Sequence, residues 1–412
     1  MLEIERLGHH GDGIAPGPVY VPLTLPGEIV NGTVLNGRIE DARIVTPSAE
    51  RVRAPCPHFR SCGGCSLQHA SDRFLAEWKE DVVRKALAAQ GLEAGFRPVH
   101  VSPARSRRRA TLAGTRTKKA AMVGFHARKS DTIVPIRDCF VLHPDLMAMI
   151  PALEEITRLG GSRSATLAFA LTRSEAGIDC AVTGGKPLDE TLRMALPRYI
   201  GRFARLTWGE ETVFTSALPV QEFGPAKVTP PPGAFLQATG DGEAALLAAV
   251  REATGSATHI ADLFAGCGTF ALPLAVAARV HAVEGDGEMI AALDRGLRLA
   301  TGLKPLTTET RDLFRRPLLA DELARFDAVL IDPPRAGAEA QTREIAKAQV
   351  PRVAMVSCNP VTFARDAKTL TEAGYRLNWV QVVDQFRWSP HVELAASLTL
   401  PHIEAKPKKG QG

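Results

Sequence analysis

The chain has 412 residues, of which 45% are hydrophobic and 23% are charged, and its formal net charge is +5. This length predicts two or three domains, and the composition is that of an ordinary soluble globular protein. The most apolar stretch, residues 264–278, is too short to span a membrane, and the N-terminus has no apolar secretory core. We therefore expect a cytoplasmic monomer with no membrane partner.

Residues 1–48 alternate short β-type runs with glycine and proline, which predicts a small N-terminal β-barrel. Small barrels of this kind often bind RNA. This segment carries three arginines against six acidic residues, so we do not expect strong phosphate contact from it.

Four cysteines come next in a three-plus-one arrangement. Cys56, Cys62 and Cys65 share one tight loop, and Cys139 follows much later. The chain has seven cysteines, and an odd count in a cytosolic-looking chain argues against a disulfide framework. Four soft ligands suit zinc or an iron–sulfur cluster, but zinc ribbons prefer two Cys-x2-Cys pairs. The spacing therefore favours a [4Fe–4S] cluster of structural role, and zinc remains the alternative.

Residues 49–228 are predicted to form a central α+β domain. It begins with the cysteine loop, and its amphipathic helix at 72–92 could also pack on the C-terminal domain. Residues 95–130 hold ten Lys or Arg and no Asp or Glu, which predicts a polyanion-binding face. The alternative is a solvated hairpin. The expected RNA contacts are Arg107, Arg108, Arg109, Lys118 and Lys119.

After the proline-rich stretch 230–233, helices and apolar strands alternate along the chain. This alternation predicts an α/β domain over residues 229–404, with a parallel sheet and crossover helices. Residues 405–412 are expected to form a disordered tail.

A glycine-rich turn, residues 262–269, follows the first strand of this domain and opens a helix. Glycines at 266 and 268 let the backbone approach a ligand closely. Glu284 ends the next strand, where a carboxylate can bind ribose hydroxyls, and Asp312 follows the third strand. No full phosphate-binding fingerprint is present, so a nucleoside without a pyrophosphate is favoured, and S-adenosylmethionine (SAM) is the obvious one. The alternative is a purely structural turn.

Two further strand ends carry reactive side chains. Asp332 follows the apolar run 329–331, and Cys358 follows the apolar run 354–356. Ligands bind at the carboxyl ends of strands in open α/β sheets, so these groups are expected to face the cofactor turn. Taken alone, a cysteine at such a position is more often a small buried hydrophobe than a nucleophile.

Five motifs occur in order along the chain and together resemble one family. They are residues 231–237 (PPGAFLQ), 262–270 (DLFAGCGTF), 332–337 (DPPRAG), 357–360 (SCNP) and 391–393 (HVE). They resemble the RNA 5-methyluridine methyltransferases, a class I SAM-dependent family with a Rossmann-like catalytic domain. The N-terminal segment resembles a TRAM module, and the cysteine spacing is similar to the family's [4Fe–4S] loop. Both additions together point to the branch that modifies large-subunit ribosomal RNA.

The resemblance assigns roles to individual residues. It implies that Cys358 is the nucleophile and Glu393 the general base, with His391 as the rival base. The chemistry of the site adds two expectations of its own. Arg335 is expected to position a phosphate or the Asp332 loop. A free thiol is mostly protonated at neutral pH, so a helix beginning at Thr362 and the nearby Arg365 are expected to lower the pKa of Cys358. Thr269 stands where relatives often have Asn. The residues that match cofactor or target-base positions are Gln237, Phe264, Gly266, Thr269, Glu284, Asp312 and Asp332.

Three other functions stay open. The first is a tRNA uracil-C5 methyltransferase. The second is an amino-methyltransferase that uses residues 332–334 to bind an exocyclic amine, a chemistry that needs no thiol. The third is a non-catalytic RNA-binding iron–sulfur protein with a degenerate methylase fold, against which the intact Cys358, Asp332 and Glu393 argue.

Overall fold

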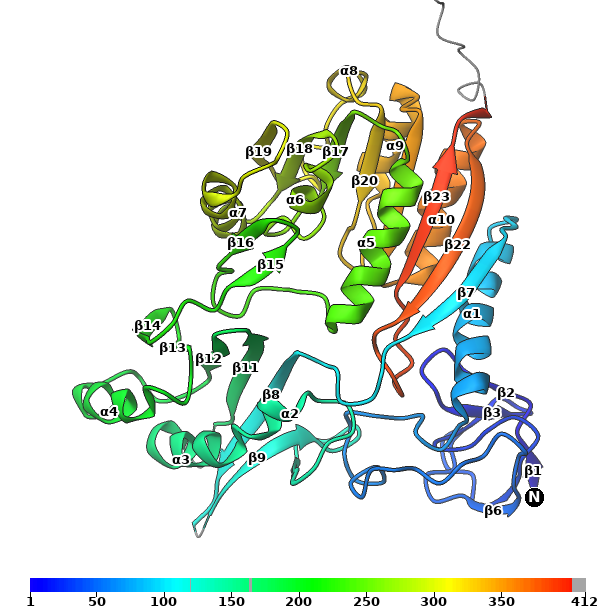
Figure 1. The fold of residues 1–412 in the computed structure, drawn as a ribbon. Helices are drawn as coiled ribbons and strands as arrows, with labels where there is room; N and C mark the ends of the chain where they lie inside the picture. The colour runs from blue at the N-terminus through cyan, green and yellow to red at the C-terminus, as the bar shows by residue number, and fades with distance from the viewer. Residues whose placement is uncertain (119, 163–164, 402–412) are drawn as a thin grey trace, which may run out of the picture.

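The computed structural model describes residues 1–118, 120–162 and 165–401 (Figure 1). Lys119 and the predicted tail, residues 405–412, lie outside the described residues. The described residues form three β-rich parts: two small N-terminal sheets, a central seven-stranded sheet and an eight-stranded sheet built mainly from the C-terminal half. The α/β fold class predicted above is confirmed. Among the described residues, no helix combines the length and the apolar character that a membrane crossing needs.

The N-terminal segment folds into two small antiparallel sheets. One has the order β1-β5-β6 and the other β2-β3-β4. Buried Ile4, Val21, Val30 and Ile39 form their shared core. The strands are β1 (Leu2–Glu3), β2 (Arg6–Leu7), β3 (Gly13–Ala15), β4 (Val19–Val21), β5 (Ile29–Asn31) and β6 (Arg43–Thr46).

The central domain is built on a seven-stranded sheet of order β10-β9-β8-β11-β12-β13-β14. Its pairs are antiparallel except β12 with β13, and α3 covers one face. The strands are β8 (Arg109–Arg116), β9 (Ala121–His126), β10 (Ile133–Pro135), β11 (Leu167–Ser174), β12 (Gly177–Thr183), β13 (Arg205–Trp208) and β14 (Glu211–Thr215). The helices are α2 (Pro144–Met147), α3 (Ile150–Gly160), α4 (Glu190–Ala195) and the 3-10 turn Leu196–Tyr199.

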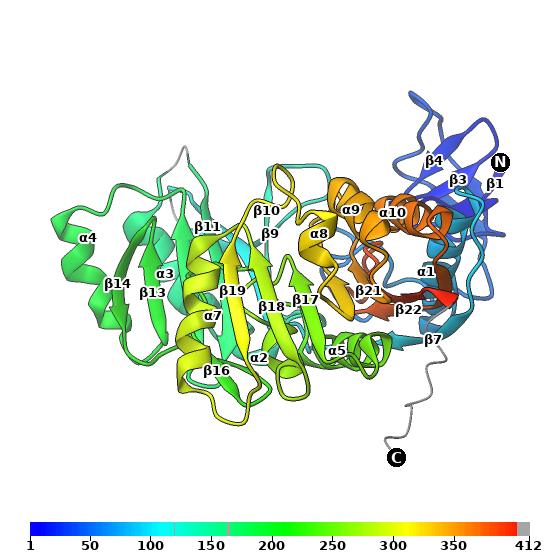
Figure 2. The same cartoon turned by 90° about the horizontal axis from the view of Figure 1, so that it is seen from above.

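The third layer is an eight-stranded sheet of order β19-β18-β17-β20-β21-β23-β22-β7 (Figures 1 and 2). Strands β19 to β21 of that order are parallel, and β23 runs antiparallel between β21 and β22. The strands are β17 (His259–Leu263), β18 (Arg279–Glu284), β19 (Leu306–Thr310), β20 (Ala328–Ile331), β21 (Arg352–Ser357), β22 (Arg376–Asp384) and β23 (Leu394–Thr399).

Helices cover both faces of this sheet, which is why its central strands are apolar on both sides. One face packs against α5 (Gly240–Thr254), α6 (Ala271–Leu274) and α7 (Gly287–Leu299). The other face packs against α8 (Ala320–Leu323), α9 (Glu339–Ala348) and α10 (Pro360–Glu372). A short hairpin, β15 (Gln221–Phe223) with β16 (Ala226–Val228), leads into this layer and contacts α7.

Two elements that precede the seven-stranded sheet in the chain join the eight-stranded sheet instead. Strand β7 (Phe96–Val101) pairs in parallel with β22, and α1 (Asp72–Ala88) packs against α10, β7 and β22. On α1, the fully buried Lys79 forms an ion pair with Asp384 at the end of β22, with 2.5 Å between Nζ and Oδ1. The eight-stranded sheet therefore carries α1, whose packing on this domain the sequence analysis allowed for, and β7, which a boundary at residue 229 leaves in the central domain.

Candidate active site

The glycine turn after β17 is shaped by backbone that only a few residues tolerate. Phe264 has a φ of +64°, and Gly266 and Gly268 have φ of +57° and +93°. A Cβ on Gly268 would lie 2.8 Å from Leu272 Cδ1, so glycine is required there by space as well as by φ. The Gly266 N–H donates to Glu284 Oε2 at 2.9 Å, which ties the turn to the end of β18.

An aromatic pair stands beside this turn. The rings of Phe264 and Phe314 lie 5.4 Å apart, and Phe314 is 49% exposed. Asp312 holds the Phe314 segment, because its Oδ1 accepts the Phe314 N–H at 3.0 Å. The half-buried Thr269 follows in the glycine turn. Phe314 was not predicted, although an exposed aromatic two residues after the predicted acid is a usable signal for a stacking wall.

Three carboxyl groups gather where β17, β18 and β20 end. Asp262 is fully buried, and a weak backbone hydrogen bond from Ala271 does not offset the cost of burying its carboxylate. Burial, and then the charges of Asp332 and Glu284, raise its pKa well above the usual value. Burial and the charge of Glu284 likewise raise the pKa of Asp332 to about 7. Glu284 accepts backbone N–H groups, but none of the three carboxyl groups has a cationic partner among the described residues. Such an acidic cluster fits a ligand that brings positive charge, as SAM does through its ammonium and sulfonium groups.

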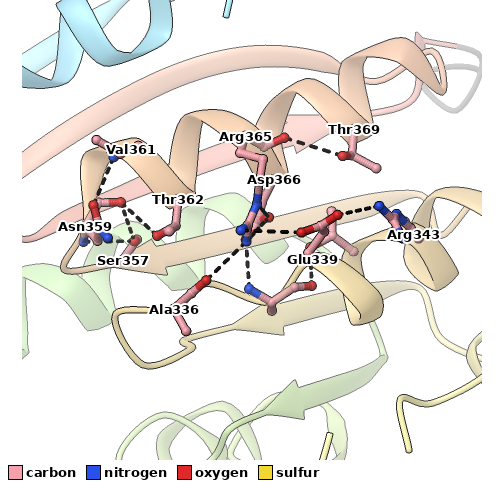
Figure 3. Close-up of polar contacts among 12 residues, drawn as sticks. Ala336, Glu339, Arg343, Ser357, Asn359, Val361, Thr362, Arg365, Asp366 and Thr369 are labelled. Atoms are coloured by element: carbon pink, nitrogen blue, oxygen red, sulfur yellow. Dashed lines mark hydrogen bonds and ion pairs between the residues drawn. The ribbon is translucent and has the colours of Figure 1, made fainter. Parts of the chain in front are cut away.

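The loop that carries Asp332 is fastened to the start of α10 (Figure 3). Asn359 Nδ2 donates to the Arg335 carbonyl at 2.8 Å, and Arg365 donates to the Ala336 carbonyl at 3.2 Å. Asn359 also caps α10 by accepting the Val361 N–H at 3.1 Å. These contacts hold the ends of β20 and β21 together, with Asp332 and Cys358 on the same side of the site.

Cys358 lies between the last residue of β21 and the cap of α10, and it is half-buried. Burial raises the pKa of its thiol to about 11, and the charges of Glu393 and Asp332 add to this rise. Arg335 is the cation that opposes the rise. Arg365, which was expected to lower this pKa, pairs with Asp366 and Glu339. Helix α10 begins at residue 360, two residues before its expected start.

Glu393 is held by a buried pair of amides. The Gln385 Nε2 donates to Glu393 Oε2 at 3.2 Å and to Gln237 Oε1 at 2.6 Å. Burial, and then the charge of Asp332, raise the pKa of Glu393 well above its usual value. Gln385 was not predicted from the sequence, where it is one polar residue after a strand and carries no signal of its own.

His391 stands at the exposed rim of the site. Its Nδ1 accepts a hydrogen bond from Arg335 at 2.8 Å, since a guanidinium can only donate. Partial burial and the charge of Arg335 lower the pKa of His391 to about 4. A neutral imidazole whose Nδ1 accepts carries its proton on Nε2, so this ring has no lone pair left for the substrate.

Comparisons with known proteins agree with this geometry. An RNA methyltransferase of uncharacterized target from Caulobacter vibrioides is 44% identical, over 97% of this chain and 99% of its own. The 23S rRNA (uracil(1939)-C(5))-methyltransferase RlmD of Shewanella sp. (strain ANA-3) is 31% identical over 97% of this chain and 95% of its own. The chain belongs to the RNA uracil-C5 methyltransferase family.

Two further matches support this RNA uracil-C5 methyltransferase assignment. The family model described as tRNA (Uracil-5-)-methyltransferase matches residues 298–400. The crystal structure of Pyrococcus abyssi tRNA (uracil-54, C5)-methyltransferase with S-adenosyl-L-homocysteine has the same fold, with a TM-score of 0.73 at 23% identity over 96% of this chain and 98% of that one. The protein is thus a SAM-dependent enzyme that methylates uracil C5 in RNA.

The methyltransferase carries the four predicted cluster cysteines close to one another. All four are free thiols. Burial, and then the charges of Cys139 and Cys62, raise the pKa of Cys65 to about 12. No group of three or more His, Cys, Asp or Glu in the described part of the chain is placed to hold a metal ion. Thiols are soft ligands of the type that bind zinc or an iron–sulfur cluster.

The basic segment lies where the central domain meets the loop before α5. Arg108 is bound within the protein, because its guanidinium pairs with Glu243 at 2.5 Å and donates to the Gln237 carbonyl at 3.2 Å. Arg107 and Arg109 have no carboxylate partner among the described residues. Arg109 stacks over Phe235, which is 58% exposed, at 4.8 Å from the ring centroid. Lys118 is exposed at the end of a hairpin, and Lys119 is outside the described residues.

Proposed function

We propose that this enzyme methylates C5 of a uridine in large-subunit (23S) ribosomal RNA, with Cys358 adding to C6 of the base and Glu393 removing the C5 proton. The observation that carries the mechanism is the pairing of a thiol and a buried carboxyl across one site, with Asp332 beside both. The 31% identical relative named for 23S rRNA, which matches nearly the whole chain, supports the RNA class.

The chemistry needs covalent help because uracil C5 is a weak nucleophile. Addition of the Cys358 thiolate to C6 places negative charge on C5 and O4, and this divides one hard step into two easier ones. SAM supplies the electrophilic methyl group. C5 then holds both a methyl group and its original proton. Glu393 removes that proton, the C5–C6 double bond re-forms, and the thiolate leaves.

Charge controls the thiol in this site. The carboxylates of Glu393 and Asp332 oppose ionisation of Cys358, and Arg335 favours it. A cationic ligand against Asp332 removes part of this opposition. The thiol is therefore expected to ionise more readily when the cationic cofactor is bound, which limits side reactions of a free thiolate.

RNA contact is proposed for the unpaired cations around the site entrance. Arg107 bridges to Thr239, Arg109 stacks over Phe235, and this exposed ring is available for base stacking. Lys118 is exposed at the end of the β8–β9 hairpin, and Lys119 is proposed with it from the sequence. The target uridine must leave its stack to reach Cys358, so an unpaired or flipped nucleotide is expected. Arg108 is expected to position the Gln237 segment instead of binding phosphate.

We test the function with unmodified in vitro transcripts of 23S rRNA and of tRNA, purified enzyme and SAM, followed by nucleoside mass spectrometry. The proposal predicts 5-methyluridine in the 23S transcript. Methylation of tRNA alone would overturn the RNA class, and a methyl group on an exocyclic amine would overturn the reaction. Cys358→Ala must abolish the product, whereas Cys180→Ala, which removes a buried thiol of the central sheet, must not.

A [4Fe–4S] cluster on Cys56, Cys62, Cys65 and Cys139 is proposed as a staple between the cysteine loop and the basic domain. Anaerobic purification with iron and sulfide analysis tests it. The expected result is about four irons and four sulfides per chain, lost in Cys139→Ser and kept in Cys180→Ser. Stoichiometric zinc without iron would contradict it.

A further inference from the structure

The buried side chain of Gln385 fixes the direction in which the Gln237 carboxamide points. Its side chain is 2% exposed and lies against the N-terminus of α5, where a Cβ on Gly242 would come within 2.9 Å of Gln385 Cβ. Its three hydrogen bonds all go to groups in or next to the site. The Ala238 N–H donates to Gln385 Oε1 at 2.7 Å. Gln385 Nε2 donates to Gln237 Oε1 and to Glu393 Oε2.

The direction of this amide is decided by the backbone. An N–H group can only donate, so the Gln385 atom that faces Ala238 must be the oxygen. The Gln385 nitrogen then faces Gln237, and only an oxygen of Gln237 can accept from it. The reverse arrangement of Gln237 would bring two NH₂ groups together, 2.6 Å apart.

The fixed direction leaves Gln237 with donors toward the rest of the site. No described residue accepts a hydrogen bond from Gln237 Nε2. In the proposed mechanism Cys358 acts on C6 and Glu393 acts on C5. Gln385 Nε2 bridges Glu393 and Gln237, so we assign Gln237 to C4, the ring atom next to C5.

We propose that Gln385 is a specificity-determining residue that locks the Gln237 carboxamide with its nitrogen toward the substrate, so that the site selects the C4 carbonyl of uracil over the C4 amino group of cytosine. The inference rests on the proposed function, because it takes the target base to lie against Cys358 and Glu393. A donor facing the C4 carbonyl forms a hydrogen bond. The same donor facing an amino group leaves two buried donors unpaired, which is the type of mismatch that discriminates most strongly.

Two substitutions separate this role from simple support of Glu393. Gln385→Met keeps the length of the side chain and removes the lock. Gln385→Glu keeps the acceptor for Ala238 but presents an oxygen to Gln237, which turns the Gln237 nitrogen inward and its oxygen toward the base. Gln381→Glu is the matched control, because Gln381 lies on β22, four residues before Gln385, and its Nε2 donates to the Pro98 carbonyl at the surface.

The probes are synthetic RNA fragments centred on the uridine that the wild-type enzyme methylates in the 23S transcript. The central base is uracil, cytosine or 2-pyrimidinone, which lacks a C4 substituent. The dissociation constant of each RNA fragment is measured with S-adenosylhomocysteine present. The melting temperature and the cofactor affinity of each variant show whether it is folded. The ratio of the cytosine to the uracil constant should fall about tenfold in Gln385→Met, the equivalent of one neutral hydrogen bond, and further in Gln385→Glu.

The outcomes are distinguishable. Gln381→Glu should keep the wild-type ratio, and the 2-pyrimidinone fragment should bind wild type more weakly than the uracil fragment does. Equal weakening of all three fragments in both Gln385 variants, with an unchanged ratio, would overturn the specificity role while the proposed function stands. If the wild-type enzyme methylates no uridine in the transcript, the proposed function fails and this inference falls with it.

Discussion

The buried pair of Lys79 and Asp384 is the most quantitative test of how α1 supports the site. Both side chains are excluded from water, at 0% and 3% exposure, with Nζ and Oδ1 2.5 Å apart. Asp384 immediately precedes Gln385, and both partners also bind Phe386, whose carbonyl accepts from Lys79 and whose N–H donates to Asp384. The pair therefore joins α1 to the segment that holds Glu393.

Lys79→Met should destabilise the protein by about 3–5 kcal/mol, because it leaves a buried carboxylate without its counter-charge. Adding Asp384→Asn removes that charge and keeps an acceptor for the Phe386 N–H. We expect the double variant to recover about half of the loss, since the remaining cost is that of about one unpaired polar group, about 1–3 kcal/mol.

Urea unfolding followed by circular dichroism measures these differences, with hydrogen exchange of α1 and β22 to locate them. The matched control is Lys85→Met on the same helix, where the partner Asp81 lies 2.6 Å away but the lysine is 69% exposed. That change should cost only about 0.3–0.5 kcal/mol. A cost below about 1 kcal/mol for Lys79→Met, or no recovery in the double variant, would refute the reasoning.

Other predictions concern the cofactor site. Gly268→Ala should lower the free energy of unfolding by about 2–5 kcal/mol and abolish SAM binding, since it adds overpacking against Leu272 to a left-handed backbone. The control Gly302→Ala changes a glycine with a similar φ in open space, and it should lower the free energy of unfolding by only about 1–2 kcal/mol. Equal losses of stability in thermal unfolding would contradict this prediction. In the folded state the pKa of Asp332 is raised to about 7 from 3.8. Between these two pH values the folded protein keeps a proton that the unfolded chain has released. Asp332 therefore lowers the stability of the fold progressively as pH rises from about 4 to about 7. Asp332→Asn should therefore raise the melting temperature of the free enzyme more at pH 8 than at pH 5, and a gain that is larger at pH 5 would contradict the sign. In the wild type, SAM binding near pH 7 should release a proton, measured by calorimetry in buffers of different ionisation enthalpy, and no release would argue against a cation beside Asp332.

Local motifs made much of this architecture predictable. The alternation of helices and strands after residue 233 predicts the parallel sheet. Short motifs directly after β17, β20 and β21 mark the ends of these strands, so the sequence alone places the site residues there. Ion-pair partners were harder to predict from the sequence. Arg108 reads as part of a basic run, but its partner Glu243 is 135 residues away, and only the fold brings the two together.

The same limit applies to the supporting amides and to the domain boundary. Gln385 acts through contacts with Gln237 and Glu393 that come from three separate segments, so no local pattern marks it. Residues 72–101 precede the central domain in sequence yet complete the catalytic layer, because β7 pairs with a strand that lies almost 300 residues later. Non-local pairing of this kind leaves no signature in composition or periodicity.

The central claim is that Cys358 bonds to C6 of the target uracil before Glu393 takes the C5 proton. The most direct measurement uses Glu393→Gln with SAM and the 23S transcript, followed by nuclease and protease digestion and mass spectrometry of the linked peptide. The account predicts a stalled adduct in which a methylated uridine is attached to Cys358 through C6. An adduct on another cysteine, or normal turnover to free 5-methyluridine by Cys358→Ala, would contradict it.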